Sequence, residues 1–457
     1  MELYGRKVIY TDVEMVEREN ILEVLQKAIP IHQTNVTQIN ELYDYYKGKQ
    51  AILQREDKTI RPDIDYRIPE NRCKEVVDFK EGYAIGDPIQ YNDRTGENQE
   101  AINQLNDIMD YEGRNHVDES VVEWNLICGT SYKVAQVKEN DDISPIEIAA
   151  LDPRQTFVVY SSGFRHEPLL GVWFVTDSEN NTYYHCYTPE RFFKVENDET
   201  IVEEQINGLG IIPIVEFPCN NSRIGAFESI IRLQDALNLV DSDRVNAIAE
   251  FVQSLIVATN CNFEEDVTAE DIMKSGIVRL TSSDGMHQDL KLLTQELDQA
   301  STQTLKDDIY SSILTICAMP NRNGGSSTSD TGIAVVYRDG WSAAETWQKK
   351  YEVVYKRSER QFLNVCCSVF DTTWGPTLRP SDIEIKFTRK NYENIYQKAQ
   401  VLDLMLKNEK IAPRLAFIYS NIFPDPEEAY KESEPYIQSA LAQTNQNTSR
   451  EALNAEQ

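Results

Sequence analysis

The run of residues best suited to contact a charged ligand is rich in glycine and hydroxyl side chains and spans residues 323–332. Backbone amides in such a run can bind phosphate, but it lacks the lysine of phosphate-binding loops and follows no predicted strand. Glycine permits large backbone excursions, so we expect a mobile loop that faces a channel and contacts a polyanion weakly. A solvated connector is the alternative, and salt bridges explain the flanking arginines equally well. The candidate residues are Arg322, Asn323, Ser326, Ser327, Thr328, Ser329 and Arg338.

Motifs for catalysis are missing from the sequence. It contains no GxxxxGK[ST], GxGxxG, HExxH or GxSxG pattern, and so lacks the signatures of nucleotide binding, zinc-dependent proteolysis and serine hydrolysis. Its five histidines show no metal-ligand spacing. Among 75 acidic residues, carboxylate pairs of the glycosidase type arise by chance. We therefore expect no catalytic residue, cofactor or metal.

The charge of the chain is strongly negative. Its 75 acidic and 45 basic residues give a net charge of −30, which disfavours tight, non-specific binding to nucleic acid or anionic membrane. Repulsion would also keep DNA from sticking to a conduit, so charge alone does not separate a conduit from a protein that never contacts DNA. No long apolar run predicts a membrane span. The eight scattered cysteines form no CxxC pair, and we expect buried free thiols.

The first half of the chain changes from helical to strand periodicity. We expect two helices within residues 12–48, the first capped by a box at Thr11–Glu14, then a long polar loop or arm over 49–70. Helices follow near 71–81 (ending before Gly82), 97–110 and 115–128. Period-two alternation then predicts an antiparallel meander within one α+β domain. Its strands are expected at 132–138, 145–151, 157–161, 169–176, 182–188, 192–196, 200–206 and 211–218.

The second half contains long helices. Residues 224–258 predict an amphipathic rod roughly 50 Å long at ~1.5 Å per residue. A short insertion at 260–298 carries nine carboxylates and three basic residues, with a small helix from Thr268 and a strand at 277–280. A second helix covers 299–318, and a capping box at Ser342–Glu345 opens a third long helix. We then expect a strand at 383–387, helices near 391–408, 412–421 and 426–441, and a disordered tail from 442.

Several short motifs occur in an order that resembles the portal proteins of tailed phages with long non-contractile tails. None is specific alone, but their order and spacing cover roughly residues 40–400. Thr331 stands where serine is common in that family, and the C-terminal region is short. The motifs are YYKGKQAIL at 45–53, RIPENRCKEVVD at 67–78 with GY at 82–83 and GDPI at 86–89, GIIPIVEF at 210–217 with NN at 220–221, DALN at 235–238 with SD at 242–243, and SDTGIA at 329–334.

The resemblance implies a portal fold of wing, stem, clip and crown that assembles into rings. The long rod, compact insertion, second rod and flexible loop predicted from the residues fit this arrangement. The divisions are a wing at 1–222, stem helices at 223–259 and 299–320, a clip at 260–298, a tunnel loop at 321–340, a long helix and wing strand at 341–390, a helical crown at 391–441 and a disordered tail at 442–457.

The resemblance also implies a function and partners. A homo-oligomeric ring, usually of twelve subunits, would lie at one capsid vertex and pass double-stranded DNA with transient, sequence-independent contacts. It would be assembled in the cytoplasm of the bacterial host, become part of the virion and contact no membrane. Partners would be the terminase large subunit, which supplies ATP hydrolysis, then a head-completion adaptor protein, and the major capsid and scaffolding proteins. Candidate clip residues for docking are Glu264, Glu265, Asp266, Glu270 and Asp271.

Two alternatives remain at the level of sequence. A non-viral acidic scaffold or interaction protein would be a monomer or small oligomer without a ring. A hydrolase that uses carboxylates would place two acids close together in a concave pocket.

Overall fold

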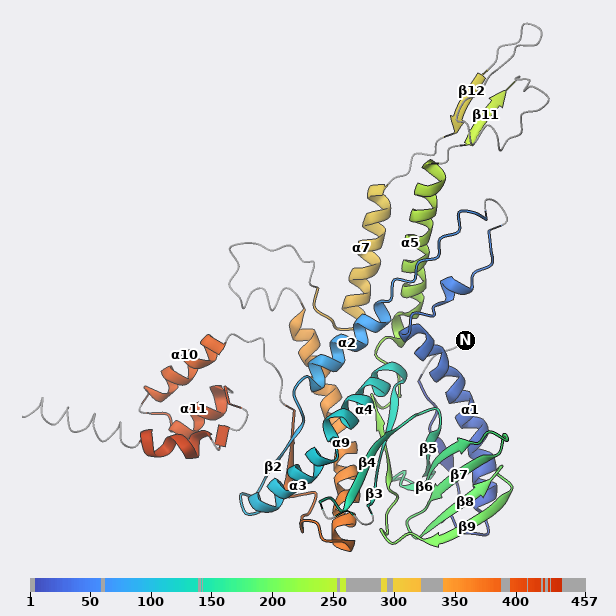
Figure 1. The fold of residues 1–457 in the computed structure, drawn as a ribbon. Helices are drawn as coiled ribbons and strands as arrows, with labels where there is room; N and C mark the ends of the chain where they lie inside the picture. The colour runs from blue at the N-terminus through green and yellow to red at the C-terminus, as the bar shows by residue number, and fades with distance from the viewer. Residues whose placement is uncertain are drawn as a thin grey trace, which may run out of the picture.

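The computed structural model describes residues 5–437 except 59–61, 139–140, 142, 253–254, 260–288, 294–298, 322–339, 388–394, 409, 421, 424–425 and 428. The fold mixes helices and sheets (Figure 1), which confirms the predicted α+β class. The helices are α1 (Ile21–Tyr46), α2 (Arg72–Ile85), α3 (Gln99–Tyr111), α4 (Arg114–Cys128), α5 (Ile231–Val252), α7 (Gln299–Ile316), α9 (Trp341–Thr372), α10 (Ile395–Leu406) and α11 (Pro413–Ser420), with short 3-10 helices at Ala51–Gln54 and Glu228–Ile230.

The strands form sheets of different sizes. The largest has the order β1-β5-β6-β7-β8-β9, in which β1 is parallel to β5 and all other pairs are antiparallel. A second has the order β10-β3-β4, and two-stranded sheets pair β13 with β2 and β11 with β12. The strands are β1 (Ile9–Thr11), β2 (Gln90–Asp93), β3 (Thr130–Val137), β4 (Ile146–Leu151), β5 (Thr156–Ser161), β6 (Pro168–Thr176), β7 (Thr182–Tyr187), β8 (Arg191–Glu196), β9 (Thr200–Ile206), β10 (Ile214–Pro218), β11 (Leu255–Thr259), β12 (Asp289–Leu293) and β13 (Ile383–Lys386).

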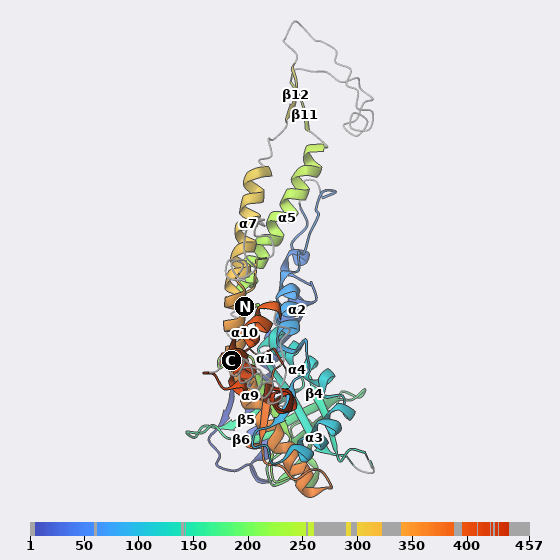
Figure 2. The ribbon, with the colours of Figure 1, turned by 90° about the vertical axis from the view of Figure 1, so that its left-hand side faces the viewer.

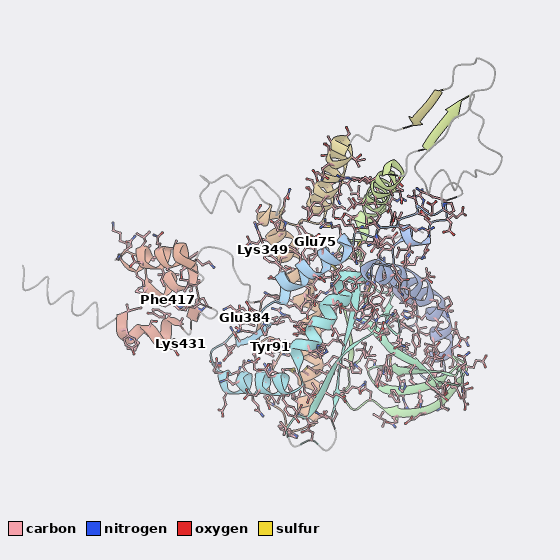
Figure 3. The ribbon with its side chains drawn as sticks, turned by 45° about the horizontal axis from the view of Figure 1, so that its top comes forward. Glu75, Tyr91, Lys349, Glu384, Phe417 and Lys431 are labelled. Carbon is pink, nitrogen blue, oxygen red and sulfur yellow. The ribbon has the colours of Figure 1, made fainter. Side chains whose placement is uncertain are left out.

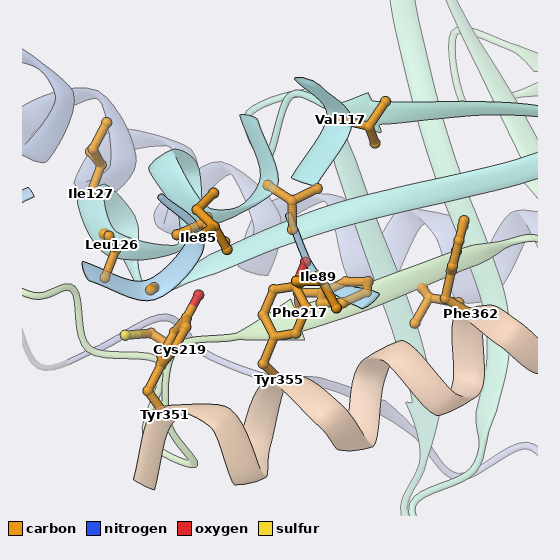
Figure 4. Close-up of a cluster of buried hydrophobic side chains, with 14 of the residues drawn as sticks. Ile85, Ile89, Val117, Leu126, Ile127, Phe217, Cys219, Tyr351, Tyr355 and Phe362 are labelled. Atoms are coloured by element: carbon orange, nitrogen blue, oxygen red, sulfur yellow. The ribbon is translucent and has the colours of Figure 1, made fainter. Parts of the chain in front are cut away.

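Two large apolar cores hold the helices and sheets together, and a smaller cluster lies around Val134 of β3, Val158 of β5 and Ile214 of β10. The main core lies where α9 packs against β10, β3 and the helices α2 and α4. Figure 4 shows aromatic side chains of α9 facing Phe217 of β10, whose ring centroid is 5.0 Å from that of Tyr355. The sheet core lies between the first half of α1 and the six-stranded sheet, and includes Phe157 and Phe193. We call the elements around these two cores the body.

A narrow helical projection rises from the body. Helices α5 and α7 lie side by side in both views, and the hairpin β11–β12 lies beyond their far ends (Figures 1 and 2). Across the part of the chain that the structure describes, every helix is too short or too polar to span a lipid bilayer. The seven cysteines within it are buried and unpaired, as predicted for them.

The N-terminal prediction of two helices was wrong. Thr11 belongs to β1, which pairs with β5, so it caps no helix. A single helix, α1, runs through Pro30, although proline removes a backbone donor. It continues because its first half packs in the sheet core and its second half, from Ile39, packs in the main core. Likewise α2 passes Gly82, because Ala84 and Ile85 beyond it are buried.

Other boundaries also differ from the predictions. The expected rod at 224–258 is α5, which ends at Val252, and residues 255–259 form a strand because they pair with β12. The long helix α9 begins at Trp341, after Gly340 in the left-handed conformation, and Ser342 does not cap it. Trp341 packs near Phe79 and Tyr83 of α2, with ring centroids 6.0 and 6.3 Å away, which favours the earlier start.

Candidate functional site: the helix pair and the arm along it

The site is built from the helix pair, α5 and α7, and from the arm, which we define as residues 62–72; its last residue is the first of α2. At ~1.5 Å per residue the two helices are about 33 and 27 Å long. The arm leads into α2 and lies along α5, 162 to 180 residues away in sequence. This contact is polar, unlike the apolar packing of the body.

Four side chains of α5 at intervals of four residues accept hydrogen bonds from alternate backbone amides of the arm. Four helical residues rise about 6.0 Å, and two extended residues advance about 6.6 Å, so the two spacings nearly match. Pro69 falls between the bonded positions, where no donor is needed. We call this set the ladder: Asn246 to Tyr66 N (2.7 Å), Ser242 to Ile68 N (2.9 Å), Asn238 to Glu70 N (2.9 Å) and Gln234 to Arg72 N (3.1 Å).

The ladder side chains are buried and use further bonds. Asn246 Nδ2 donates to Tyr66 O at 3.1 Å, and Gln234 Nε2 donates to Glu70 O. Asn238 Nδ2 donates to Gln50 Oε1. Because each amide both donates and accepts, the ladder recognises the arm chiefly by its backbone, as a neighbouring β-strand would.

Charged residues join the arm to both helices of the pair. Lys306 of α7 lies 2.8 Å from a Glu70 oxygen and 2.9 Å from an Asp241 oxygen. Partial burial would raise the pKa of Glu70, but hydrogen bonds from Asp241 and Lys306 and the charge of Arg72 lower it to about 2. Burial and the neighbouring Glu70 raise the pKa of Asp241. Lys306 thus binds both carboxylates at the point where the arm, α5 and α7 meet.

A second set of contacts lies nearer the body. The Arg72 guanidinium lies 4.1 Å from the ring centroid of Tyr310, an arrangement suited to cation–π attraction. Tyr310 donates to Glu75 at 3.2 Å, and Glu75 also pairs with Arg72 at 2.7 Å. Farther out, Arg244 donates to Gln303 at 2.7 Å. Polar groups therefore join α5 to α7 at two neighbouring positions and join α7 to the start of α2.

The helix pair leaves apolar side chains uncovered. Leu239 and Ile248 of α5 are 42% and 45% exposed, and Leu305 and Ile316 of α7 are 50% and 52% exposed. Leu305 and Ile316 are 11 residues apart, close to three turns, and so share one face of α7. A thin, two-helix projection cannot bury these side chains by itself. They form a surface suited to cover by another protein chain.

A buried ionic cluster stabilises the body instead. Lys133 of β3 is fully buried, lies 2.9 Å from Glu359 and also pairs with Asp118. Burial alone would lower the pKa of Lys133, but the two carboxylates raise it. Tyr91 donates to Glu359, and Tyr355 donates to Asp118 at 3.3 Å. Arg114 of α4 adds a second buried cation, 3.5 Å from Asp118. These groups pair with one another away from solvent, so the cluster connects α4, β3 and α9 structurally.

The residues singled out in the sequence lie outside the described part of the chain. This holds for the loop candidates Arg322, Asn323, Ser326, Ser327, Thr328, Ser329 and Arg338, and for the clip candidates Glu264, Glu265, Asp266, Glu270 and Asp271.

The structure does describe residues that flank the two segments 322–339 and 260–288. A Cβ placed on Gly340 would lie 3.5 Å from Met319 O, so the segment 322–339 starts and ends at one place beside the body. The pairing of β11 with β12 likewise brings together the ends of 260–288. Both segments are therefore insertions with closed ends.

The ladder was missed in the sequence, although a signal for it existed. Gln234, Asn238, Ser242 and Asn246 form a polar line at spacing four on an otherwise amphipathic helix. Such a line on one face indicates a specific polar partner. Within the described residues, no group of three or more histidine, cysteine or acidic side chains is placed to hold a metal ion.

Comparisons with known proteins give one family match. The family model described as "Phage portal protein, SPP1 Gp6-like" matches residues 25–434. No curated protein matches the sequence. Two similar solved structures are titled "Neck of empty GTA particle computed with C6 symmetry" and "Virion of native gene transfer agent (GTA) particle". Both chains are 13% identical, cover 77% of this chain and 90% of their own, and give TM-scores of 0.43 and 0.42. The family match includes the helix pair, the arm and the main core.

Proposed function

Because the chain belongs to the SPP1 Gp6-like family of phage portal proteins, we propose that its copies form a ring at one vertex of a phage capsid. Double-stranded DNA is packaged and later ejected through the centre of this ring. The observation that carries the proposal is the family match over residues 25–434. The chain has a structural role in this proposal, and ATP hydrolysis belongs to the terminase.

The shape of the helix pair supports assembly into a ring. Leu239, Ile248, Leu305 and Ile316 are uncovered in the single chain. Burial of apolar area at about 25 cal/mol per Å² favours a neighbour that covers them. Because the same surfaces recur on every copy, contact between unlike faces closes a ring when the rotation between copies divides a full turn. We propose the usual portal number, twelve.

The ends of the projection support separate roles for the two insertions. The hairpin β11–β12, which brings together the ends of residues 260–288, lies beyond the far end of the helix pair. We propose that this clip, through Glu264, Glu265, Asp266, Glu270 and Asp271, docks the terminase large subunit and later a head-completion adaptor protein. The tunnel loop, with Arg322, Asn323, Ser326, Ser327, Thr328, Ser329 and Arg338, contacts the DNA.

Electron microscopy of the purified protein tests the ring. We expect closed rings with a central hole, and a mass by light scattering that is a whole multiple of one chain. A single compact particle at every concentration would contradict the proposal.

Deletion of residues 324–329 tests the loop separately. We expect rings of normal size that package or retain less DNA. Normal packaging by the deletion variant would remove the loop assignment and leave the ring unaffected.

A further inference from the structure

Helix α9 separates its charges by sign. Between residues 346 and 370 its two acidic side chains, Glu352 and Glu359, are 8% and 0% exposed. Its basic side chains over the same span are exposed or half-buried. We call them the basic face: Lys349, Lys350, Lys356, Arg357 and Arg360. The other acids of α9, half-buried Glu345 and exposed Asp371, lie near its two ends. In a chain with a net charge of −30, a stretch of helix between them with five basic groups and no exposed acid stands apart from the average surface.

Three residues of the basic face are exposed and form no ion pair with another described residue. They are Lys350, Arg357 and Arg360. Lys349 pairs with Glu345 at 2.7 Å, and Lys356 lies 5.5 Å from the ring centroid of Phe387. A polyanion that approaches this side would therefore meet at least three unpaired cations.

The spacing on α9 produces a line parallel to the helix axis. Residues 346, 349, 350, 353, 357, 360 and 364 follow intervals of three and four, so they share one side of the helix. From Lys350 to Arg360 the rise is about 15 Å, which spans several phosphates of a DNA strand at about 3.4 Å per nucleotide along the duplex axis. Gln361 and Asn364, both exposed, add amide donors, which also bind phosphate oxygens.

The position of α9 separates this face from the six-stranded sheet. The helix packs on β10, β3 and β4, and the six-stranded sheet lies on the other side of the body (Figure 1). Its first turn follows Gly340, which closes the segment 322–339. Figure 3 shows Lys349 near that end of α9. The basic face thus continues away from the point where the proposed tunnel loop begins and ends.

From these observations we infer that the basic face of α9 contacts the phosphate backbone of the DNA duplex as it passes through the ring. The inference rests on the proposed portal function and adds a second DNA contact beyond the tunnel loop. Contacts of this kind are sequence-independent and salt-sensitive. Long, flexible side chains can exchange one phosphate for the next, so the duplex is guided without being held.

A neighbouring subunit fits this face less well than DNA. Protein interfaces are depleted in lysine and bury apolar groups at their centres, whereas Val353 is the one large apolar side chain exposed within the line. The exposed apolar residues of α5 and α7 are better candidates for subunit contact.

Binding of a short fluorescent DNA duplex to purified rings, measured over a series of NaCl concentrations, tests the inference. The variant is Lys350→Gln, Arg357→Gln and Arg360→Gln together. We expect intact rings that bind roughly tenfold more weakly at low salt. The slope of log K against log salt should fall by about 0.9 for each phosphate that the variant no longer neutralises. Replacement by the other basic residue (Lys350→Arg, Arg357→Lys and Arg360→Lys) should restore both values.

A matched control removes three exposed basic residues on the side of α1 and the six-stranded sheet, Lys7→Gln, Lys27→Gln and Arg165→Gln. This control should leave the slope unchanged. An equal decrease of the slope in the control and the α9 variant would overturn the inference, as would no decrease in either or no binding by wild-type rings. Loss of rings in the α9 variant alone would make the face a subunit contact. Failure of the wild-type chain to form rings would instead count against the proposed function.

Discussion

The body and the helix pair of this portal protein are stabilised in different ways. In the body, buried charges satisfy one another inside a continuous apolar core, as Lys133, Asp118 and Glu359 do. In the helix pair, a polar ladder and a few ion pairs fix the geometry, and apolar side chains stay uncovered. The difference shows that the body buries its own apolar groups, whereas the helix pair does not, which agrees with the proposal that neighbouring copies cover it.

The largest effect is expected from breaking the ionic cluster of the body. Lys133→Met leaves Glu359 buried without its paired cation and leaves Asp118 with Arg114 alone, 3.5 Å away. It should lower the free energy of unfolding by about 3–5 kcal/mol. Urea denaturation of the unassembled chain measures this. Lys7→Met, at an exposed position, should change the same quantity by less than about 0.5 kcal/mol. A small decrease for Lys133→Met would show that the body does not depend on its buried charges.

Removing one rung of the ladder should act locally and less strongly. Asn238→Ala leaves Glu70 N and the Gln50 side chain without their partner, which costs about 2–3 kcal/mol. Hydrogen exchange at the arm amides should accelerate roughly 30- to 150-fold, while exchange in β3 stays unchanged. Leu239→Ala, one residue along α5 and exposed, is the control and should leave arm exchange as it is. Equal acceleration in β3 would mean that the arm and the body open together.

Mild acid should weaken the body by a similar or smaller amount. Burial lowers the pKa of His32 from 6.5 to about 4, despite its contact with the Arg154 carbonyl. The unfolded chain therefore binds a proton below pH 6.5 that the folded chain excludes, so stability is complete above that pH and declines toward pH 4. Lowering the pH from 7 to 5 should cost about 2 kcal/mol through this group. His32→Gln should reduce that part of the pH dependence in urea denaturation, and an unchanged dependence would contradict it.

The smallest effect on the single chain is expected from the exposed apolar residues of α7. Leu305→Ser with Ile316→Ser should change the stability of the unassembled chain by less than about 0.5 kcal/mol. The same pair should reduce ring formation, measured by analytical ultracentrifugation, because each copy then has less apolar surface to bury against its neighbour. Phe164→Ser, fully exposed on the body, should leave assembly unaffected. Assembly unchanged by the α7 pair would place the subunit contact elsewhere.

Strands of the body could be predicted well because their signal is local. All eight strands expected along residues 130–218 occur. Strands β7 and β8 alternate buried and less buried residues. Strands β3, β5 and β10 are buried on both sides, and the enrichment in Tyr, Val, Phe and Thr indicated them instead. The five residues 255–259 show the limit. Their apolar, β-branched run continued a helical pattern, and only the pairing with β12, some 34 residues away, makes them a strand. The conformational preference of a short segment does not show which distant segment it pairs with.

The site was predictable only in outline. The long helices and the insertions between them were visible in the sequence. The ladder was not, because spacing four in α5 and spacing two in the arm have meaning only when the two segments lie together. The separation of charge on α9 was hidden for the same reason. Glu352 and Glu359 alternate with the basic residues along the chain, and only packing shows which side is buried.

The ladder also limits its own length. The helix presents a side chain about every 6.0 Å, and the extended arm presents an amide about every 6.6 Å. Because the two spacings differ, the offset between side chain and amide grows with each step. Over three intervals the offset reaches about 2 Å, most of what flexible amide side chains can absorb within hydrogen-bond distance. A fifth side chain and a fifth amide would lie too far apart for a hydrogen bond. The position four residues before Gln234 is the apolar Ile230, and beyond Arg72 the arm turns into a helix.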